Sequence, residues 1–356
     1  MIGIVGFANL RIMQYLNKYT DILDKNNIEY EVIYWNRDGG TEEKTFKGRT
    51  ICYEYNMNSY QAFQKKIAGF VKYTKFMLKT IKERKYDKLI VLTSQTAIPL
   101  YRLLLKKYNG RYIFDYRDIT KEHLGFYKKM VKNLVENSYI TPLSSFGFQK
   151  IIGESDKHIV SHNCSNLKIQ EIAHKTGEKI NISFWGLIRH AELNKKICDA
   201  FGKDQRFNLF YHGDGFYHEL KKYCEEKSYD NVVFTGRYNR DEILGFAENA
   251  NIVHCVYSNN WITKNTLAVK LYDAIRYEKP IMVMKNSYLS EYLDGYDFKF
   301  DFQYSDNIAE EVYNWYMTLD RDKYGEQYKI ICEKVNQDDK LFEEKVLKFT
   351  EITSND

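Results

Sequence analysis

The sequence predicts an α/β protein built from two doubly wound, Rossmann-like parallel sheets, in two domains that face each other across a cleft, with a helical C-terminal tail. Short apolar runs of strand length alternate with longer runs whose apolar residues recur at helical spacing. Such alternation gives parallel sheets covered by helices on both faces. The alternation restarts after a polar stretch at residues 163–178, and 356 residues suffice for two domains.

Residues 1–165 are expected to form the first domain, with short apolar strands and amphipathic helices in turn. The expected strands are Ile2–Gly6, Tyr30–Trp35, Thr50–Tyr55, Lys88–Leu92, Arg111–Asp115, Ser138–Thr141 and His158–His162. The expected helices are 10–25, 60–85, 97–108, 121–136 and 145–152.

Residues 166–304 are expected to form the second domain on the same plan, with helices filling the gaps between strands. Residues 305–356 form a polar tail that is expected to be helical and to pack back toward the first domain. The expected strands of the second domain are Lys179–Trp185, Phe207–His212, Val232–Thr235, Ile252–Val256, Ile281–Met284 and Phe298–Phe300.

One segment, residues 265–284, combines a polar helix face with a buried strand. Thr266, Lys270 and Asp273 share one face of the expected helix, which is predicted to start at Asn265-Thr266 and to offer free N–H groups there. Pro280 ends the helix, and the apolar run that follows has the length of a parallel strand. A cation, a carboxylate and free N–H groups together suit a nucleoside diphosphate sugar.

Composition excludes several classes of protein. No Cys-x-x-Cys pair occurs, so metal and redox motifs are unsupported. The apolar N-terminus is too short for a signal peptide, and no apolar run reaches membrane-spanning length, so a cytoplasmic protein is expected. Gly3-x-x-Gly6 is not a dinucleotide fingerprint. The first 165 residues carry 27 Lys and Arg against 16 Asp and Glu, and the rest carry 26 against 32, which indicates different surroundings.

Four motifs in order over residues 180–300 resemble the donor domain of GT-B-fold glycosyltransferases of the family 4 (group 1) type. They are Phe184-Trp-Gly186-Leu-Ile-Arg189 followed by Lys195, then Gly213-Asp-Gly215, then the strand ending in Gly236-Arg237, then the segment from Asn265 to Asp273. In the family, two acids eight residues apart stand in the last motif. Here Asp273 holds the second position and Asn265 holds the first.

The resemblance implies a role for each residue of these motifs. Arg189 and Lys195 would contact the donor diphosphate and Asn265 would stand near the sugar, and we group them as catalytic candidates with His123. The donor-binding candidates are Gly186, Gly213, Gly215, Gly236, Arg237, Thr266, Lys270 and Asp273, the last as ribose ligand. The ordinary alternatives are solvated charges for Arg189 and Lys195, an exposed salt bridge for Lys270 and Asp273, and a strand-to-helix turn for Gly213-Asp-Gly215.

Phe114-Asp115-Tyr-Arg117-Asp118 and His162-Asn163 resemble capsule and exopolysaccharide members of the family. Arg117, Asp118 and His123 are therefore candidates for the acceptor side. As alternatives, His123 is a surface histidine, and Arg117 pairs with Asp118 to fix the loop.

The resemblance implies a retaining transfer of a sugar from a UDP- or GDP-linked donor to a lipid-linked saccharide in bacterial surface polysaccharide synthesis. The donor phosphate would take the proton of the attacking hydroxyl, with no protein nucleophile. The alternatives are a sugar-nucleotide 2-epimerase on the same fold and a non-catalytic protein that binds a nucleotide sugar or a partner. No cofactor and no essential metal are expected, because Asp320-Arg-Asp322 lies in the polar tail.

The segment 62–85 carries eight Lys and Arg residues and one acid, Glu83. Phe63, Ile67 and Phe70 begin an apolar stripe that is expected to face the core. The basic face is either an ordinary solvated helix face or a face that rests on anionic lipid, where Lys128, Lys129 and Lys132 would add to it. Nucleic acid is not expected, because no RNA-binding motif accompanies these charges.

Overall fold

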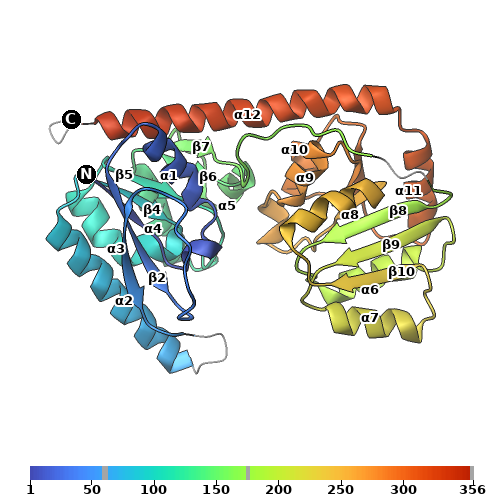
Figure 1. Ribbon diagram of the computed structural model, residues 1–356, viewed down its shortest axis with the longest axis horizontal. Helices are drawn as coiled ribbons and strands as arrows, with labels where there is room; N and C mark the ends of the chain where they lie inside the picture. The colour runs from blue at the N-terminus through green and yellow to red at the C-terminus, as the bar shows by residue number, and fades with distance from the viewer. Residues whose placement is uncertain (58–62, 174–176, 353–356) are drawn as a thin grey trace. The chain divides into compact units, whose positions relative to one another are not determined.

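The computed structural model describes residues 1–57, 63–173 and 177–352, and it divides into two compact units (Figure 1). Unit 1 contains Met1–Ser165 and Gln337–Asp356, and unit 2 contains Asn166–Asn336. Among the described residues, every helix is either too short or too polar to cross a lipid bilayer.

Unit 1 is built on a parallel sheet in the order β3-β2-β1-β4-β5, extended beyond β5 by the parallel pair β6-β7 through isolated bridges. Its strands are β1 (Ile2–Val5), β2 (Tyr30–Asn36), β3 (Arg49–Glu54), β4 (Lys88–Leu92), β5 (Tyr112–Asp115), β6 (Thr141–Leu143) and β7 (His158–Val160). Its helices are η1 (Leu10–Ile12), α1 (Leu16–Lys25), α2 (Phe63–Arg84), α3 (Ser94–Lys107), α4 (Gly125–Glu136), η2 (Phe146–Phe148) and α5 (Gln149–Ile152).

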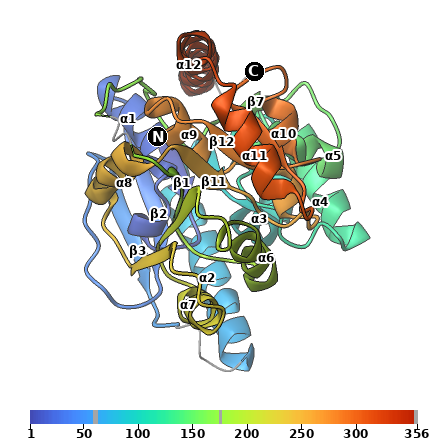
Figure 2. The ribbon, with the colours of Figure 1, turned by 90° about the vertical axis from the view of Figure 1, so that its right-hand side faces the viewer.

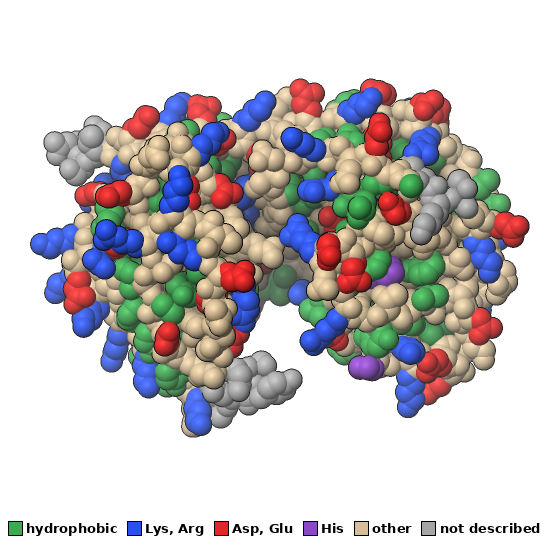
Figure 3. Space-filling model, in the orientation of Figure 1, with side chains coloured by type: hydrophobic (Ala, Val, Ile, Leu, Met, Phe, Trp, Pro, Cys, Tyr) green, Lys and Arg blue, Asp and Glu red, His purple; other side chains and the backbone are tan. Residues whose placement is uncertain are grey.

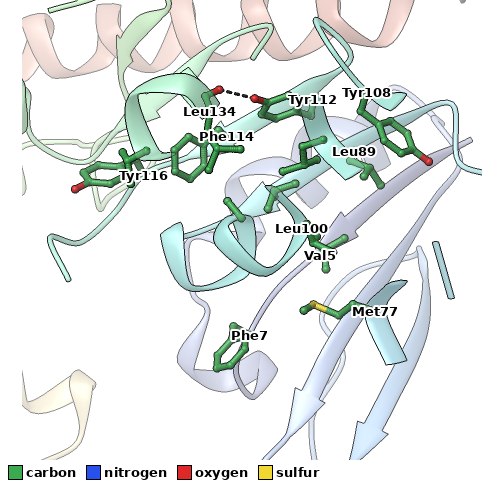
Figure 4. Close-up of a cluster of buried hydrophobic side chains, with 14 of the residues drawn as sticks. Val5, Phe7, Met77, Leu89, Leu100, Tyr108, Tyr112, Phe114, Tyr116 and Leu134 are labelled. Carbon is green, nitrogen blue, oxygen red and sulfur yellow. Dashed lines mark hydrogen bonds between the residues drawn. The ribbon is translucent and has the colours of Figure 1, made fainter. Parts of the chain in front are cut away.

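Two hydrophobic layers enclose this sheet. One layer packs α2, α3, α4 and α5 against the strands, and aromatic side chains such as Tyr112 and Phe114 fill it (Figure 4). The Tyr112 hydroxyl there donates to the carbonyl of Leu134 at 2.5 Å. The other layer packs α1 against the strands, together with the last part of α12 (Arg321–Glu351), which contributes Phe342 and Val346.

Unit 2 is built on a six-stranded parallel sheet in the order β10-β9-β8-β11-β12-β13. Helices α6, α7 and α11 cover one face, and α8 and α9 lie on the other (Figure 2). Its strands are β8 (Ile180–Trp185), β9 (Phe207–His212), β10 (Val232–Gly236), β11 (Ile252–Cys255), β12 (Ile281–Met284) and β13 (Lys299–Phe302). Its helices are α6 (Ala191–Phe201), α7 (Tyr217–Glu226), η3 (Arg240–Glu242), α8 (Ile243–Asn249), η4 (Thr263–Asn265), α9 (Lys270–Arg276), α10 (Tyr288–Tyr292) and α11 (Ile308–Met317).

The expected fold class is confirmed: two doubly wound parallel-sheet units with a helical C-terminal tail. Two local expectations within unit 1 were wrong. The strand expected at Ser138–Thr141 forms at Thr141–Leu143, because the Ser138 hydroxyl and N–H both bond the carbonyl of Val135 and close the preceding helix. Ile67 does not face the core, because the buried stripe of α2 runs through Tyr73 and Met77 and leaves Ile67 47% exposed.

Candidate functional site

The strand order of unit 2 reverses between β8 and β11, which lie side by side. From this point β9 and β10 extend to one side, and β12 and β13 to the other. In doubly wound sheets, the crevice beyond the carboxyl ends of the two strands at such a point is the usual ligand site. The residues that follow β8 and β11 therefore form the expected ligand site of unit 2.

Lys270 and Asp273 both reach the carboxyl end of β8 from α9. The Lys270 ammonium lies 3.9 Å from the ring centroid of Phe184, and the Asp273 carboxylate accepts a hydrogen bond from Trp185. Phe184 and Trp185 are the last two residues of β8. The structure thus brings this predicted cation and this predicted carboxylate together at one strand end. Within the described residues they form no ion pair with each other, so the alternative of an exposed salt bridge is wrong.

The Lys270 side chain is a buried cation without a carboxylate partner. The residue is 6% exposed, and its Nζ donates to the Tyr257 hydroxyl at 2.5 Å. In the described chain, no Asp or Glu oxygen lies within 4.0 Å of this Nζ. Burial alone would lower the pKa of Lys270, but its contacts with Tyr257 and Cys255 outweigh burial and raise it. Because a buried unpaired charge is costly, this arrangement suits an anionic ligand.

His254 lies beneath this cation on β11. It is fully buried and its ring centroid lies 5.3 Å from that of Phe184. Burial and the nearby Lys270 charge lower the pKa of His254 to about 3. The imidazole is therefore neutral near pH 7, and Lys270 supplies the positive charge at this point of the site.

The Asp273 carboxylate is held on one side only. The Trp185 indole N–H donates to Oδ2 at 2.8 Å, and no hydrogen bond from a described residue reaches Oδ1. Burial raises the pKa of Asp273, whereas the indole bond and the charges of Arg240 and Lys270 lower it. One carboxylate oxygen thus remains for a ligand hydroxyl.

Three glycines bring the backbones of neighbouring loops into contact beside these side chains. Gly186, Gly213 and Gly215 have φ values of +129°, +146° and +99°. A Cβ on Gly213 would lie 1.8 Å from the Gly186 carbonyl oxygen, and one on Gly186 would lie 3.3 Å from the Lys270 ammonium. Gly213 is therefore required by the close approach of two loops, as the turn alternative predicts, and the Lys270 ammonium lies directly beside Gly186.

The other predicted cations of unit 2 differ in how far their charge is already balanced. Arg189 is exposed and forms no ion pair within the described chain. Lys195 pairs with Glu192 at 2.9 Å and with Glu219 at 2.8 Å. Arg237, after Gly236, pairs with an aspartate in the Gly213–Gly215 turn and is 87% exposed. Among the predicted cations of this paragraph, Arg189 therefore joins Lys270 as one without a carboxylate partner in the described part of the chain.

The region before α9 departs from the expected helix start. The α-helix begins at Lys270, after the short η4 turn, so Asn265-Thr266 does not open it. The reason is local: the Thr266 hydroxyl and N–H both bond the Thr263 carbonyl. Asn265 is buried, and its amide donates to the Trp261 carbonyl at 3.0 Å. The predicted role of Asn265 near the sugar stays a prediction.

Arg117 in unit 1 belongs to a buried ion pair. Its guanidinium binds both oxygens of Asp115, at 2.5 and 2.9 Å, and its remaining donors bind the Ser161 carbonyl and hydroxyl, each at 2.7 Å. Arg117 therefore pairs with Asp115, and the alternative pair with Asp118 is wrong. Asp118 and His123 are both exposed, at or after the carboxyl end of β5.

No group of three or more His, Cys, Asp or Glu side chains suited to a metal ion occurs in the described ranges. Asp320, from the Asp-x-Asp sequence of the tail, instead caps α12 by accepting the N–H groups of Asp322 and Lys323.

Two residues of the β8–β11 site were missed from sequence. Trp185 ends an expected strand within a donor-site motif but had no predicted role, and Tyr257 lies just beyond another expected strand. A tryptophan that ends a buried strand needs an acceptor for its N–H, which is the signal that could have indicated Trp185. Nothing in the sequence singles out Tyr257 from the 31 tyrosines of the chain.

No protein-family model and no curated protein matches the chain. Solved structures do match over almost the whole chain. HepE of Anabaena, in complex with UDP and glucose, matches with a TM-score of 0.70 and 12% identity, over 99% of each chain. Sucrose-phosphate synthase of Thermosynechococcus elongatus matches with a TM-score of 0.69 and 10% identity, over 98% of this chain and 94% of its own. The lipopolysaccharide outer core galactosyltransferase WaaB matches with a TM-score of 0.63 and 13% identity, over 98% and 99%.

These similarities establish the fold that the sequence predicts. The neighbours are GT-B-fold proteins, and this chain shares their fold over almost its whole length. At 10–13% identity they support the fold alone, so the activity rests on the site described above.

Proposed function

We propose that this chain is a GT-B glycosyltransferase that transfers a sugar from a nucleotide sugar to a saccharide acceptor. The observation that carries the proposal is the Lys270 ammonium, buried without a carboxylate partner beside Gly186, at the point where the sheet order of unit 2 reverses. Of the ligands that GT-B neighbours bind, a nucleoside diphosphate supplies the missing negative charge. HepE, a neighbour in fold, has been solved with UDP and with UDP-glucose.

In this proposal the diphosphate lies over Gly186, against Lys270 and the start of α6. The N-cap of α6 is His190, and its side chain makes no capping bond to the first N–H groups of the helix. Helix N-termini and lysine ammonium groups both favour phosphate oxygens. Arg189, exposed and outside any ion pair with the described residues, stands directly before this helix.

The ribose would be bound by the open oxygen of Asp273, which can accept a hydrogen bond from a ribose hydroxyl. Negative charge develops on the departing diphosphate, and the fixed positive charge of Lys270 would stabilise it without reorganisation. We propose a retaining, metal-independent transfer in which the donor phosphate takes the proton of the attacking hydroxyl. Positioning and charge stabilisation would then supply the catalysis.

A second candidate is a nucleotide-sugar-binding protein without transferase activity. Asn265 favours it, because a buried amide bonded to the Trp261 carbonyl stands where the resemblance leads us to expect an acid. The two functions share a donor site and differ only in turnover.

The test is a panel of UDP- and GDP-linked sugars, scored by thermal shift and then by isothermal titration. A ligand that binds only the folded state raises the melting temperature. We expect at least one nucleotide sugar to bind, and to be hydrolysed or transferred in the presence of saccharide acceptors. Binding without turnover would select the second candidate, and no binding by any member of the panel would contradict both.

We further propose that the acceptor is lipid-linked, as in surface polysaccharide synthesis, and that α2 rests on an anionic membrane. Ile67, Val71 and Leu78 are 37–49% exposed on one side of α2. Figure 3 shows Lys and Arg side chains projecting along the edge of unit 1 where α2 lies, with hydrophobic side chains between them. The exposed lysines on this side of the helix are Lys75, Lys79 and Lys82. Apolar side chains rimmed by lysine suit the surface of an anionic bilayer.

Co-sedimentation with vesicles tests this surface. We expect binding to vesicles that contain phosphatidylglycerol and not to pure phosphatidylcholine, and loss of binding in the triple variant I67S/V71S/L78S. The control is Ile330→Ser on α12, which removes an apolar side chain that is 59% exposed outside this surface. Equal binding by the triple variant and the control would contradict the proposal. Residue 62 of the basic segment lies outside the described residues.

A further inference from the structure

Trp185 makes a contact that packing alone does not explain. It is the last residue of β8, it is 2% exposed, and its single donor points at the carboxylate of Asp273. An indole N–H can only donate. The bond of 2.8 Å to Oδ2 therefore fixes which oxygen of Asp273 is taken and leaves the other oxygen open.

Burial of the Asp273 carboxylate disfavours its charged form, and neighbouring donors and cations must offset this effect. Burial raises the pKa of Asp273, and the bond from Trp185 is the largest influence that lowers it, ahead of the charges of Arg240, Lys270 and Arg276. A donor held by a strand is more rigid than an arginine or lysine side chain, because β8 lies inside the sheet between β9 and β11. The indole therefore fixes the direction of the carboxylate and favours its charged form against the effect of burial, which still raises the pKa of Asp273 on balance.

We propose that Trp185 is the positioning residue of the donor site: it holds the Asp273 carboxylate so that the open oxygen accepts a hydrogen bond from a ribose hydroxyl of the bound nucleotide. The inference rests on the proposed function, since it needs a nucleoside diphosphate at this site. It adds that selection of ribose over deoxyribose depends on a residue that does not touch the ligand.

This role differs from a structural one in what it predicts. If Trp185 only packed the end of β8, its replacement would weaken the binding of all nucleotides by the same factor, or of none. If it positions Asp273, its replacement weakens the binding only of ligands that carry ribose hydroxyls. It also shifts to higher pH the point at which affinity is lost by protonation of Asp273, because the bond that favours the carboxylate is gone.

The experiment compares Trp185→Phe with the wild type in isothermal titration of UDP and GDP, and of the 2′,3′-dideoxy form of whichever binds. Phe keeps most of the apolar surface and removes the N–H. We expect about tenfold weaker binding of the ribonucleotide, consistent with one hydrogen bond to a charged group, and unchanged binding of the dideoxy form. Asp273→Asn should show the same selective loss with the indole intact, and adding Trp185→Phe to it should have no further effect.

Trp315→Phe is the matched control. Trp315 on α11 also donates its indole N–H, to the Asp297 carbonyl at 3.0 Å, so its replacement removes the same bond away from the site. It should leave both affinities unchanged. Wild-type affinity for the ribonucleotide in Trp185→Phe, or equal losses for both ligands, would overturn the inference alone. Failure of the wild type to bind either nucleotide would overturn the proposed function, and the inference with it.

Discussion

Replacing Lys270 by Met should weaken nucleotide binding and should leave the free energy of unfolding unchanged or higher. The ammonium is buried, its hydrogen-bond partner is the Tyr257 hydroxyl, and no carboxylate of the described chain balances it. A hydrogen bond to a charged group contributes about 1.5–3 kcal/mol, so the variant should bind a nucleoside diphosphate about 10- to 150-fold more weakly. Met fills a similar volume and makes favourable contacts with an aromatic ring such as Phe184. The free energy of unfolding should therefore stay within about 1 kcal/mol of the wild type or rise.

The assay pairs isothermal titration of UDP or GDP with urea unfolding of the unliganded protein. Lys222→Met is the control, because Lys222 lies on α7 with its side chain 77% exposed and only a long ion pair, to Glu226. It should change neither quantity. The reasoning is refuted if Lys270→Met binds as the wild type does. It is also refuted if the variant loses more than about 3 kcal/mol of stability, because Lys270 would then be a structural residue.

Three further predictions concern stability and are measured by urea unfolding. Gly213→Ala should lower the free energy of unfolding by about 3 kcal/mol, because the new Cβ would lie 1.8 Å from a backbone carbonyl oxygen. Gly245→Ala has open space around it and should be neutral or stabilising by about 0.5–1 kcal/mol. Equal effects of the two variants would contradict the contact at Gly213. The pKa of His254 is about 3 in the folded state and 6.5 in the unfolded chain, so stability should fall as pH drops from about 6.5 toward 3, by up to about 1.4 kcal/mol per pH unit. His254→Phe should flatten this slope. An unchanged slope would exclude His254 as its source. Arg117→Met should lower the free energy of unfolding by about 3–5 kcal/mol, because it leaves the buried Asp115 unpaired. Arg237→Met, with the side chain 87% exposed, should lower it by less than about 0.5 kcal/mol. A small loss for Arg117→Met would show that the buried pair contributes little.

The fold could be predicted because the spacing and the length of the apolar runs indicate which segments form strands and which form helices. Strand-length apolar runs alternate with helical spacing through both halves of the chain, and every strand of the two large sheets lies on or next to an expected one. Strand order could not be read from these runs, since all of them are similarly apolar. It comes from the packing of whole elements.

The site could be predicted only in part. Lys270 and Asp273 were found because i,i+3 spacing places side chains on one face of a helix, and that rule is local. The predicted start of α9 was wrong because the Thr266 hydroxyl donates to the Thr263 carbonyl. Such a side-chain bond to the backbone competes with helix formation, and the spacing of apolar residues gives no sign of it. Arg117 was predicted as an acceptor-side residue, with a pair to Asp118 as the alternative, whereas burial favours the bidentate pair with Asp115 two residues before it. Trp185 was missed because its acceptor lies 88 residues away.

The helix α12 has a consequence for the order in which the chain folds. Its residues from Gln337 onward belong to unit 1, where Phe342, Val346 and Phe349 fill one core layer and Lys88 bonds the Thr350 carbonyl. During synthesis these residues leave the ribosome only after all of unit 2 has been made. The core layer of unit 1 that faces α12 therefore stays open while unit 2 acquires its own contiguous core. The unit that is synthesised first is completed last.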